Sequence, residues 1–307
     1  MLVSITGGSG FIGRLLVQKH LHQGDEVRVL SRQSFPDRGK LRYFYGDLHN
    51  ASCNLEKFIN GADVLYHCAA EIADESVMHS LHVDATTRLA KVAAGNIGRW
   101  VQLSSVGAYG PCLEGVVNES DLERPVGVYE TTKTQADNVL FENSVCKNFE
   151  LVVLRPSIVF GEMMPNQSLA QMSRVIRKGL FFYIGPSGAV VNYVHVSDVV
   201  KALLVCATHN KAKGNTYILS CSVSLEEMVE AVCKGLNAKM PTLRLPEYPI
   251  RLLVKTLGKY PYIPLTEGRV DALTGRCIYD ASAICNDLDY SFEQPLVSAF
   301  RNYAASL

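Results

Sequence analysis

The sequence has no excess of charge of either sign, no Cys-x-x-Cys pair and no long hydrophobic run. Its 307 residues include 30 Lys and Arg against 30 Asp and Glu, which gives no support for a nucleic acid or an acidic membrane as the main partner. Nine scattered cysteines indicate no disulfide framework. No segment approaches the roughly 18 apolar residues of a membrane-spanning helix. We therefore expect a soluble, cytoplasmic protein with reduced thiols and no nucleic-acid or membrane partner.

A metal site is not expected either. His79 and His82 lie three residues apart in a predicted helix and could share a face, but no third ligand lies nearby in the sequence. We interpret both as structural histidines.

The chain does have the length and apolar content of a large folded protein. With 48% hydrophobic residues it can bury a full core, either as one large α/β domain or as a nucleotide-binding domain with a smaller companion. Strand-like and helix-like segments alternate over the first half, and short helices separated by prolines follow residue 223. This pattern predicts an α/β fold, with a Rossmann-type doubly wound parallel sheet and a smaller, mostly helical C-terminal substrate domain.

The predicted elements place two units along the chain. We expect residues 1–163 plus 192–221 to form the dinucleotide-binding unit, and residues 164–191 plus 222–307 to form the substrate-binding unit. Asn192–Val196 is expected to return to the parallel sheet. The other expected strands are Leu2–Ile5, Val27–Ser31, Leu41–Tyr45, Asp63–His67, Trp100–Ser104, Leu151–Leu154 and Tyr217–Ser220, and the long helices are Val77–Ala94 and Val128–Cys146.

A glycine-rich turn separates the first strand from the first helix. Gly8, Gly10 and Gly13 have the spacing of a dinucleotide fingerprint, and we expect them respectively to permit a sharp bend, leave room for a pyrophosphate and let the helix pack closely. Gly7 adds a second, wider spacing with Gly10 and Gly13. The N-terminal amides of the helix would face the anion. The cofactor-binding candidates of this turn are Gly7, Gly10, Phe11, Ile12 and Gly13.

The end of the second strand predicts which dinucleotide is bound. An acidic residue there would hydrogen-bond the ribose hydroxyls of NAD, but this sequence has Ser31 and Arg32. A guanidinium suits the additional phosphate of NADP, so we expect NADP, with NAD as the alternative. For Arg32, a solvated surface arginine is the structural alternative.

Two further strand ends supply cofactor-binding candidates. Asp47, with Leu48 beside it, could accept a hydrogen bond from the adenine amino group, or could instead cap the following turn. The small residues Ala69 and Ala70 follow the fourth strand and would let the dinucleotide pass close to the backbone. Both places lie where ligands bind in open parallel sheets, at the carboxyl ends of the strands.

Tyr129 and Lys133 lie four residues apart in a predicted helix, so their side chains leave the same face. An ammonium favours a phenolate, and we expect Lys133 to lower the pKa of Tyr129 from its usual value of about 10. Such a tyrosine can exchange a proton with an alcohol or carbonyl oxygen while hydride moves at the attached carbon. Ser105, at a strand end, could hydrogen-bond the same oxygen. The alternative is a surface tyrosine packed over a lysine side chain.

Several motifs follow one another over nearly the whole chain. They are Thr6–Gly13, Asp47–Leu48, His67–Ala70, Ser104–Gly110, Tyr129-x-x-x-Lys133, Arg155–Pro156 with Phe160–Gly161, and Tyr193–Asp198. Together they resemble the extended short-chain dehydrogenase/reductase family, the NAD(P)-dependent epimerase/dehydratase group. The resemblance implies that Tyr129 is the acid/base and that Lys133 tunes its pKa and binds the nicotinamide ribose. It also implies that Ser105 orients the substrate carbonyl.

The resemblance assigns residues outside this triad as well. Pro156 would border the nicotinamide and the substrate, and Arg269 would be a candidate for binding a substrate pyrophosphate. His195 would be architectural. Relatives commonly dimerise through the helices that correspond to Val77–Ala94 and Val128–Cys146, so a homodimer is expected.

Departures from the family pattern bear on the substrate. The acid of the dehydratases is missing after Ser105, which disfavours dehydration. Val191 stands where many UDP-sugar epimerases have a phosphate-binding arginine, and His82 stands where the family has an asparagine. Together with Arg32, these substitutions favour an NADPH-dependent ketoreductase over the simplest epimerase.

Three functional hypotheses remain open. The leading one is hydride transfer at a C4-type secondary alcohol or ketone of a nucleotide-linked sugar, by a 4-ketoreductase or a 4-epimerase. The first alternative is a dihydroflavonol-reductase-like or 3β-hydroxysteroid-dehydrogenase-like reductase of an apolar ketone. The second is a non-catalytic NADP-binding sensor or assembly protein, because a fold alone does not establish activity.

Overall fold

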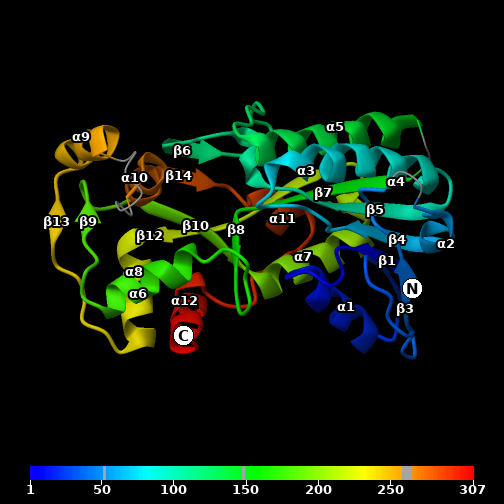
Figure 1. Ribbon diagram of the computed structural model, residues 1–307, viewed down its shortest axis with the longest axis horizontal. Helices are drawn as coiled ribbons and strands as arrows, with labels where there is room; N and C mark the ends of the chain where they lie inside the picture. The colour runs from blue at the N-terminus through cyan, green and yellow to red at the C-terminus, as the bar shows by residue number, and fades with distance from the viewer. Residues whose placement is uncertain (51–52, 147–148, 258–264) are drawn as a thin grey trace.

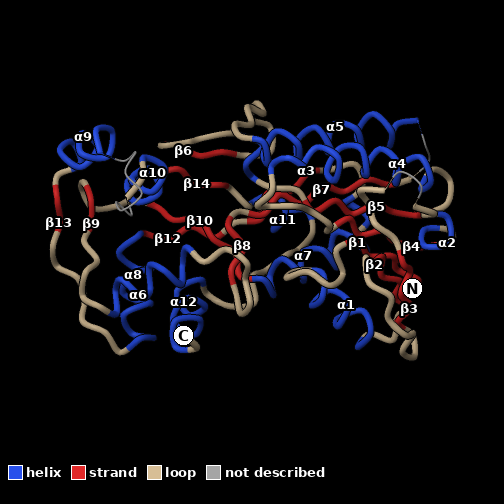
Figure 2. The backbone as a smooth tube through the Cα atoms, in the orientation of Figure 1, coloured by secondary structure: helices blue, strands red, loops and turns tan. Residues whose placement is uncertain are grey.

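A seven-stranded parallel sheet forms one half of the molecule (Figure 2). The structure, a computed structural model, describes residues 1–50, 53–146, 149–257 and 265–307. The strand order is β11-β7-β5-β4-β1-β2-β3. The strands are β1 (Leu2–Thr6), β2 (Glu26–Ser31), β3 (Leu41–Tyr45), β4 (Ala62–His67), β5 (Ile97–Leu103), β7 (Glu150–Pro156) and β11 (Thr216–Leu219). The order reverses between β1 and β4, and in such sheets a ligand site lies at that reversal.

Helices cover both faces of this sheet, as expected for a parallel sheet whose strands are largely apolar (Figure 1). The bounds are α1 (Gly13–His22), α2 (Glu56–Ile59), α4 (Ala85–Ala93), α5 (Val128–Cys146), α7 (Val196–Thr208) and α11 (Ser282–Asp287). One core joins the sheet to α2, α4 and α5 through residues such as Phe58, Leu89 and Leu140. The core on the opposite face includes Leu16 of α1 and Leu203 of α7. The predicted Rossmann-type fold is therefore confirmed.

The helix expected over Val77–Ala94 is interrupted. It consists of α3 (Glu75–His79), a π-helical turn η1 (Ser80–Asp84) and then α4. The hydroxyls of Thr86 and Thr87 donate to the carbonyls of His82 and Val83, at 2.5 and 2.9 Å. Such hydroxyl bonds compete with the backbone ladder and often accompany bends. The helical periodicity of the sequence predicts the helix but not the turn.

The rest of the chain forms smaller sheets and a separate hydrophobic core, called the second core below. Its strands are β6 (Glu114–Val117), β8 (Ile158–Phe160), β9 (Tyr183–Ile184), β10 (Val190–His195), β12 (Cys221–Ser224), β13 (Arg244–Leu245) and β14 (Arg276–Tyr279), and its helices are α6 (Ser168–Arg177), α8 (Leu225–Leu236), α9 (Glu247–Leu257), α10 (Glu267–Thr274) and α12 (Leu296–Ala305). Short turns η2 (Val106–Tyr109) and η3 (Asn210–Ala212) complete the described elements. Pairings are β12-β10-β8, β13-β9 and β14-β6.

One expected strand placement is wrong. Asn192–Val196 was expected to rejoin the parallel sheet, but β10 pairs with β8 and β12 in a three-stranded sheet. Its residue Val191 is buried in the second core, with Phe160 and Phe300. An alternating apolar pattern predicts a strand but does not say which sheet it joins.

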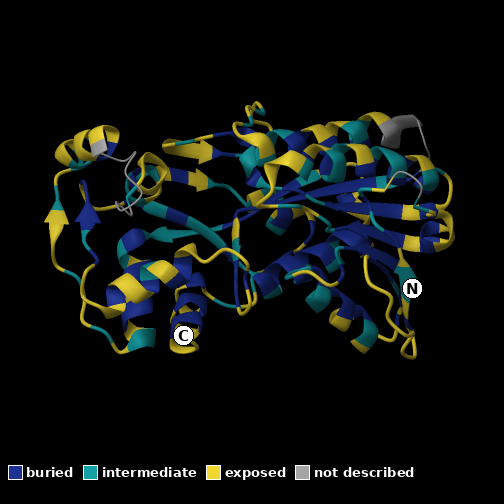
Figure 3. Cartoon of the chain, in the orientation of Figure 1, coloured by how far each residue is buried: buried dark blue, intermediate teal, exposed yellow. Residues whose placement is uncertain are grey.

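Exposure differs between the two halves of the molecule. Figure 3 shows buried strands through the main sheet and an exposed surface over α9 at the far end. Tyr248, Leu252 and Leu253 of α9 are among its exposed apolar side chains. Among the described helices, none combines the length and apolar character needed to cross a bilayer.

Candidate active site

The glycine turn lies against the carboxyl end of β4. Gly7 has φ +68°, and a Cβ there would lie 2.7 Å from the amide nitrogen of Ala69 and 2.8 Å from the carbonyl oxygen of Cys68. The sharp bend is therefore at Gly7, and its assignment to Gly8 is wrong. At Gly8 the missing side chain instead leaves space for Val29, whose Cγ1 would lie 2.9 Å from a Cβ.

The other two glycines of the fingerprint have different surroundings. A Cβ on Gly13 would lie 2.1 Å from the Gly7 carbonyl oxygen, so the start of α1 packs on the turn as expected. In the part of the chain that the structure describes, a Cβ on Gly10 would have only that oxygen within 4 Å, at 3.2 Å. Gly10 therefore has open space beside it, and contact with a pyrophosphate there stays a prediction.

The N-terminus of α1 presents free backbone donors. Within the described part of the chain, the amides of Phe11 and Ile12 have no hydrogen-bond acceptor. Phe11 packs against the second core and Ile12 against the core of the main sheet. A helix N-terminus with unpaired N–H groups attracts an anion, because its amides and its dipole act in the same direction.

At the end of β2, the structure places a free cation. The Arg32 side chain is exposed and has no ion pair or hydrogen bond with any described residue. The neighbouring Ser31 is buried, and its Oγ accepts from the amide of Gln33 at 3.0 Å. Arg32 is thus available to bind a ligand. The same exposure is expected of a solvated surface arginine, which is the structural alternative for this residue.

The other cofactor-binding candidates lie just after the ends of β3 and β4. Asp47 Oδ1 accepts from the amide of His49 at 3.0 Å, so Asp47 caps its turn, which was the structural alternative for this residue. The carbonyl of the buried Leu48 accepts from Arg88. Ala69 donates its amide to Thr6 Oγ1 at 3.3 Å, and Ala70 is exposed.

The turn that carries Ser105 packs against the first turn of α5. Ser105 is the N-cap of η2, and its Oγ accepts from the amide of Gly107 at 3.1 Å. A Cβ on Gly107 would lie 2.5 Å from Cγ of Glu130, which directly follows Tyr129. The absence of a side chain at Gly107 therefore allows the predicted serine and tyrosine to lie on adjoining turns.

Lys133 connects α5 to the same strand end. Its side chain is buried, and Nζ donates to the carbonyl of Leu103 at 2.7 Å, two residues before Ser105. Burial lowers the pKa of Lys133, whereas the nearby Asp137 carboxylate opposes that shift. The ammonium thus lies at the carboxyl end of β5, one helical turn from Tyr129.

The surroundings of Tyr129 raise its pKa, whereas the sequence predicts a lowered pKa. Burial of the phenol, with Glu130 and Asp137 nearby, raises the pKa of Tyr129 to about 12. The expected lowering by Lys133 is therefore wrong for the protein alone. Carboxylates near a phenol disfavour a second negative charge, and these two lie on the same helix as Tyr129. At neutral pH the side chain is a phenol, which is a proton donor.

A buried polar network that the sequence motifs do not predict lies next to these residues. Asp137 Oδ2 accepts from Ser104 Oγ at 2.6 Å and from Arg155 at 3.2 Å, and Arg155 also donates to Glu123 at 2.5 Å. Ser104 precedes Ser105, and Arg155 precedes Pro156, so the network fixes both strand ends. The available signal was the position of Asp137, four residues after Lys133 on the same helix face.

The remaining candidates lie apart or have structural contacts. Arg269 is exposed on α10 and donates to Gln171 Oε1 of α6 at 3.2 Å. His195 caps α7 by accepting from the amide of Ser197, in line with its architectural assignment. Pro156, at the end of β7, is in register with Leu219 of β11. In the described residues, no group of three or more His, Cys, Asp or Glu is arranged to hold a metal ion.

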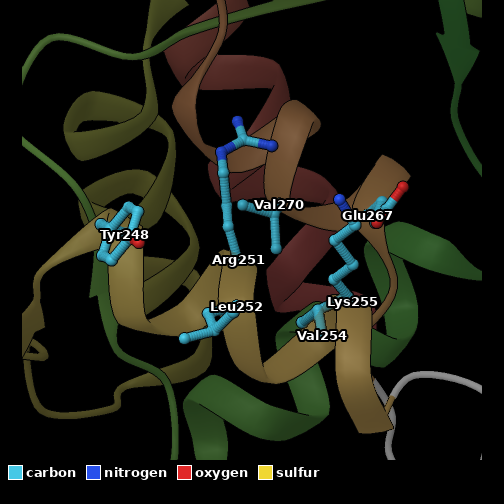
Figure 4. A pocket seen from close by; sticks show the side chains of 7 residues that line it. All are labelled: Tyr248, Arg251, Leu252, Val254, Lys255, Glu267 and Val270. Atoms are coloured by element: carbon cyan, nitrogen blue, oxygen red, sulfur yellow. The ribbon is translucent and has the colours of Figure 1, made fainter.

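A separate hollow of about 440 Å³ lies between α9 and α10 (Figure 4). Its lining combines apolar Tyr248, Leu252, Val254 and Val270 with charged Arg251, Lys255 and Glu267. Arg251 is already paired with Glu247 and Asp271. Figure 1 places these two helices in the half of the molecule away from the main sheet, so this hollow contains none of the predicted catalytic residues.

Comparison with known proteins gives consistent family and fold matches. The family model described as the NAD dependent epimerase/dehydratase family matches residues 3–220. UDP-glucose 4-epimerase of Vibrio cholerae is 26% identical over 98% of this chain and 94% of its own length. The 4-hydroxy-2-methyl-3-oxo-4-farnesyl-3,4-dihydroquinoline-1-oxide ketoreductase of Stigmatella aurantiaca is 28% identical over 74% of this chain and 70% of its own. The solved structure of MoeE5 in complex with UDP-glucose and NAD has a TM-score of 0.76 at 23% identity, covering 99% of this chain and 97% of that one, and therefore shares the fold.

Proposed function

Because the chain belongs to the NAD-dependent epimerase/dehydratase family, we propose that it is a nicotinamide-dependent oxidoreductase acting on a nucleotide-linked sugar. The reaction is hydride transfer at a C4-type secondary alcohol or ketone. A 4-ketoreductase is favoured, and a 4-epimerase is the other reaction that the same groups serve. The observation that carries the proposal is the convergence of Lys133 Nζ, the Ser105 turn and the first turn of α5 at one end of β5.

In the reductive direction, two side chains act on the substrate carbonyl oxygen. Ser105 Oγ accepts from the Gly107 amide, so its own proton is free to be donated to that oxygen. Tyr129, a phenol at neutral pH, gives its proton to the same oxygen, while a bound reduced nicotinamide would supply the hydride to the attached carbon. The ammonium of Lys133 stabilises the phenolate that results.

The cofactor proposed for this site is NADP, held by groups in the segments that follow β1 and β2. The free amides of Phe11 and Ile12 bind the pyrophosphate, and the unpaired Arg32 guanidinium binds the additional phosphate of the adenosine ribose. Asp47 and the Ala69–Ala70 strand end line the path of the dinucleotide. NAD remains the alternative, because the exposure of Arg32 fits a solvated surface arginine as well as a phosphate-binding one.

Two further assignments belong to the proposal. Arg269 binds the substrate pyrophosphate, for which its exposed position on α10 leaves it accessible. The chain forms a homodimer through the helical segments Val77–Ala94 and Val128–Cys146, that is α3, η1 and α4 together with α5. Sedimentation or size-exclusion measurements of mass test the dimer directly.

A reductase of an apolar ketone is the second candidate function, and one observation favours it. Exposed apolar side chains lie close in the sequence to predicted site residues: Ile72 (54% exposed) follows Ala70, Val128 (38%) precedes Tyr129, and Ile158 (48%) follows Pro156; Met163 (77%) lies beside Arg14 at the start of α1. Val191, at the position where many UDP-sugar epimerases have an arginine, is only 8% exposed and offers no charge to a phosphate. The farnesylated substrate in the name of the Stigmatella relative is of this apolar kind.

Ligand binding and turnover together test the proposal. A ligand that binds only the folded chain raises its melting temperature, so NADP, NAD and UDP are compared by thermal shift. A 4-ketoreductase consumes NADPH in proportion to a UDP-linked 4-ketohexose, whereas a 4-epimerase interconverts UDP-glucose and UDP-galactose without net oxidation of cofactor. Reduction of a steroid ketone without any response to UDP favours the second candidate. If neither dinucleotide changes the melting temperature, the proposed function is wrong.

A further inference from the structure

His82 lies in the π-helical turn η1 and is 1% exposed. Its ring stands edge-on to the ring of Tyr129, with the centroids 5.7 Å apart and the planes at 87°. Single-turn π insertions are frequent at functional sites, where they redirect a side chain. This position in η1 lets His82 reach across to the first turn of α5.

The hydrogen bonds of His82 fix its protonation. Nε2 accepts from the backbone amide of Glu71 at 3.0 Å, because an amide can only donate. Nδ1 therefore carries the proton and donates to Thr132 Oγ1 at 2.8 Å. Burial and the nearby Lys133 ammonium lower the pKa of His82 to about 4, which agrees with a neutral ring.

The chain of hydrogen bonds continues into the backbone around Tyr129. Thr132 Oγ1 donates in turn to the carbonyl of Val128 at 2.8 Å, with the carbonyl of Tyr129 itself at 3.1 Å. His82 thus contacts Tyr129 in two ways. Its ring packs against the tyrosine ring, and through Thr132 it is linked to the backbone of the helical turn that carries Tyr129. It also ties that turn to Glu71, which follows the Ala69–Ala70 strand end.

We propose that His82 is a positioning residue that sets the orientation of the Tyr129 phenol. It makes no bond to substrate or cofactor and acts through Tyr129 and Thr132. The inference rests on the proposed role of Tyr129 in proton transfer, but the orientation of that ring can be measured without any turnover.

The test uses protein labelled with 3-fluorotyrosine, in which the fluorine signal of Tyr129 is the one missing from a Tyr129→Phe sample. His82→Phe keeps an aromatic ring beside Tyr129 but removes both hydrogen bonds. We expect it to shift or split the Tyr129 signal while leaving the signals of remote tyrosines such as Tyr248 in place. The matched control is His79→Asn, because the His79 side chain is exposed on the preceding turn and makes a polar contact only with Asp84 among the described residues, at 3.6 Å.

Turnover gives a second readout, with NADPH and a UDP-linked 4-ketohexose as the probes. A tyrosine displaced by about 1 Å loses up to roughly 100-fold in rate, so we expect kcat of His82→Phe to fall by about 10- to 100-fold. The NADPH affinity should change less than about twofold. In the double variant with Tyr129→Phe, the two losses should not multiply, because both act on the same proton transfer.

Failure of the inference is distinguishable from failure of the proposed function. An unchanged Tyr129 fluorine signal in folded His82→Phe overturns the inference even where no substrate is turned over. Multiplying losses in the double variant also overturn it. If His82→Phe does not fold, Thr132→Val removes the linking hydroxyl alone and should shift the same signal; an unchanged signal there has the same consequence.

Discussion

Replacement of Gly10 by alanine separates cofactor binding from folding. Among the described residues, a Cβ on Gly10 would meet only the Gly7 carbonyl oxygen within 4 Å, at 3.2 Å, so the protein can accept the methyl with a small adjustment. We expect the free energy of unfolding to change by less than about 1 kcal/mol. The same change at Gly13 places a methyl 2.1 Å from that oxygen, and we expect it to cost at least about 1–3 kcal/mol.

The expected effect of Gly10→Ala on NADP binding follows from the dinucleotide pyrophosphate, which we propose to lie beside Gly10. A methyl between the turn and the pyrophosphate removes at least one charge-assisted hydrogen bond, worth about 1.5–3 kcal/mol. The dissociation constant of NADP should therefore rise by roughly 10- to 150-fold. The measurements are calorimetric titration with NADP and urea unfolding of the same preparation.

The matched control is Gly268→Ala in α10, where no atom of the described residues beyond the helix's own backbone and the two chain neighbours lies within 4 Å of the added methyl. It should leave the dissociation constant unchanged. The reasoning is refuted if Gly10→Ala binds NADP as tightly as the parent chain, because the dinucleotide then does not approach this glycine.

Three further predictions concern the cofactor, the buried network and pH. Arg32→Glu should weaken NADP relative to NAD by at least about tenfold in titrations, since it replaces a charge-assisted contact by repulsion; an unchanged ratio rejects the phosphate site. Asp137→Asn should destabilise the chain by about 1–3 kcal/mol in urea, because it removes the buried carboxylate that accepts from Ser104 and Arg155 while Arg155 keeps its ion pair with Glu123, and full stability would contradict the network. Burial, with the Lys133 ammonium, lowers the pKa of His67 to about 3 and of His82 to about 4. Both bind protons more readily when unfolded, so stability is full above about pH 6.5 and should fall by several kcal/mol towards pH 4; equal urea midpoints at pH 7 and pH 5 would contradict this.

The sheet was predictable because its signals are local. Short apolar runs that end at glycine or small residues mark β1, β4 and β5 within a few residues of their observed bounds. The bend was misplaced by one residue because Gly7 and Gly8 are adjacent and two glycine spacings overlap. Only the backbone angle at Gly7 and its closeness to Cys68 separate them.

The electrostatics of the site depend on contacts that spacing does not give. The distance of Lys133 from Tyr129 along the helix suggests a lowered tyrosine pKa, but burial together with Glu130 and Asp137 raises the pKa of Tyr129 to about 12. Arg155 reaches Asp137 from another strand. Partners of this kind become visible only once the elements are packed.

The central claim is that Tyr129 gives a proton to a substrate oxygen beside a bound nicotinamide. It is tested most directly by turnover of Tyr129→Phe, measured together with its affinity for NADPH. We predict that kcat falls by roughly 10²- to 10⁴-fold while NADPH binds with nearly the parent affinity. Turnover equal to that of the parent chain, with cofactor bound, would contradict the account.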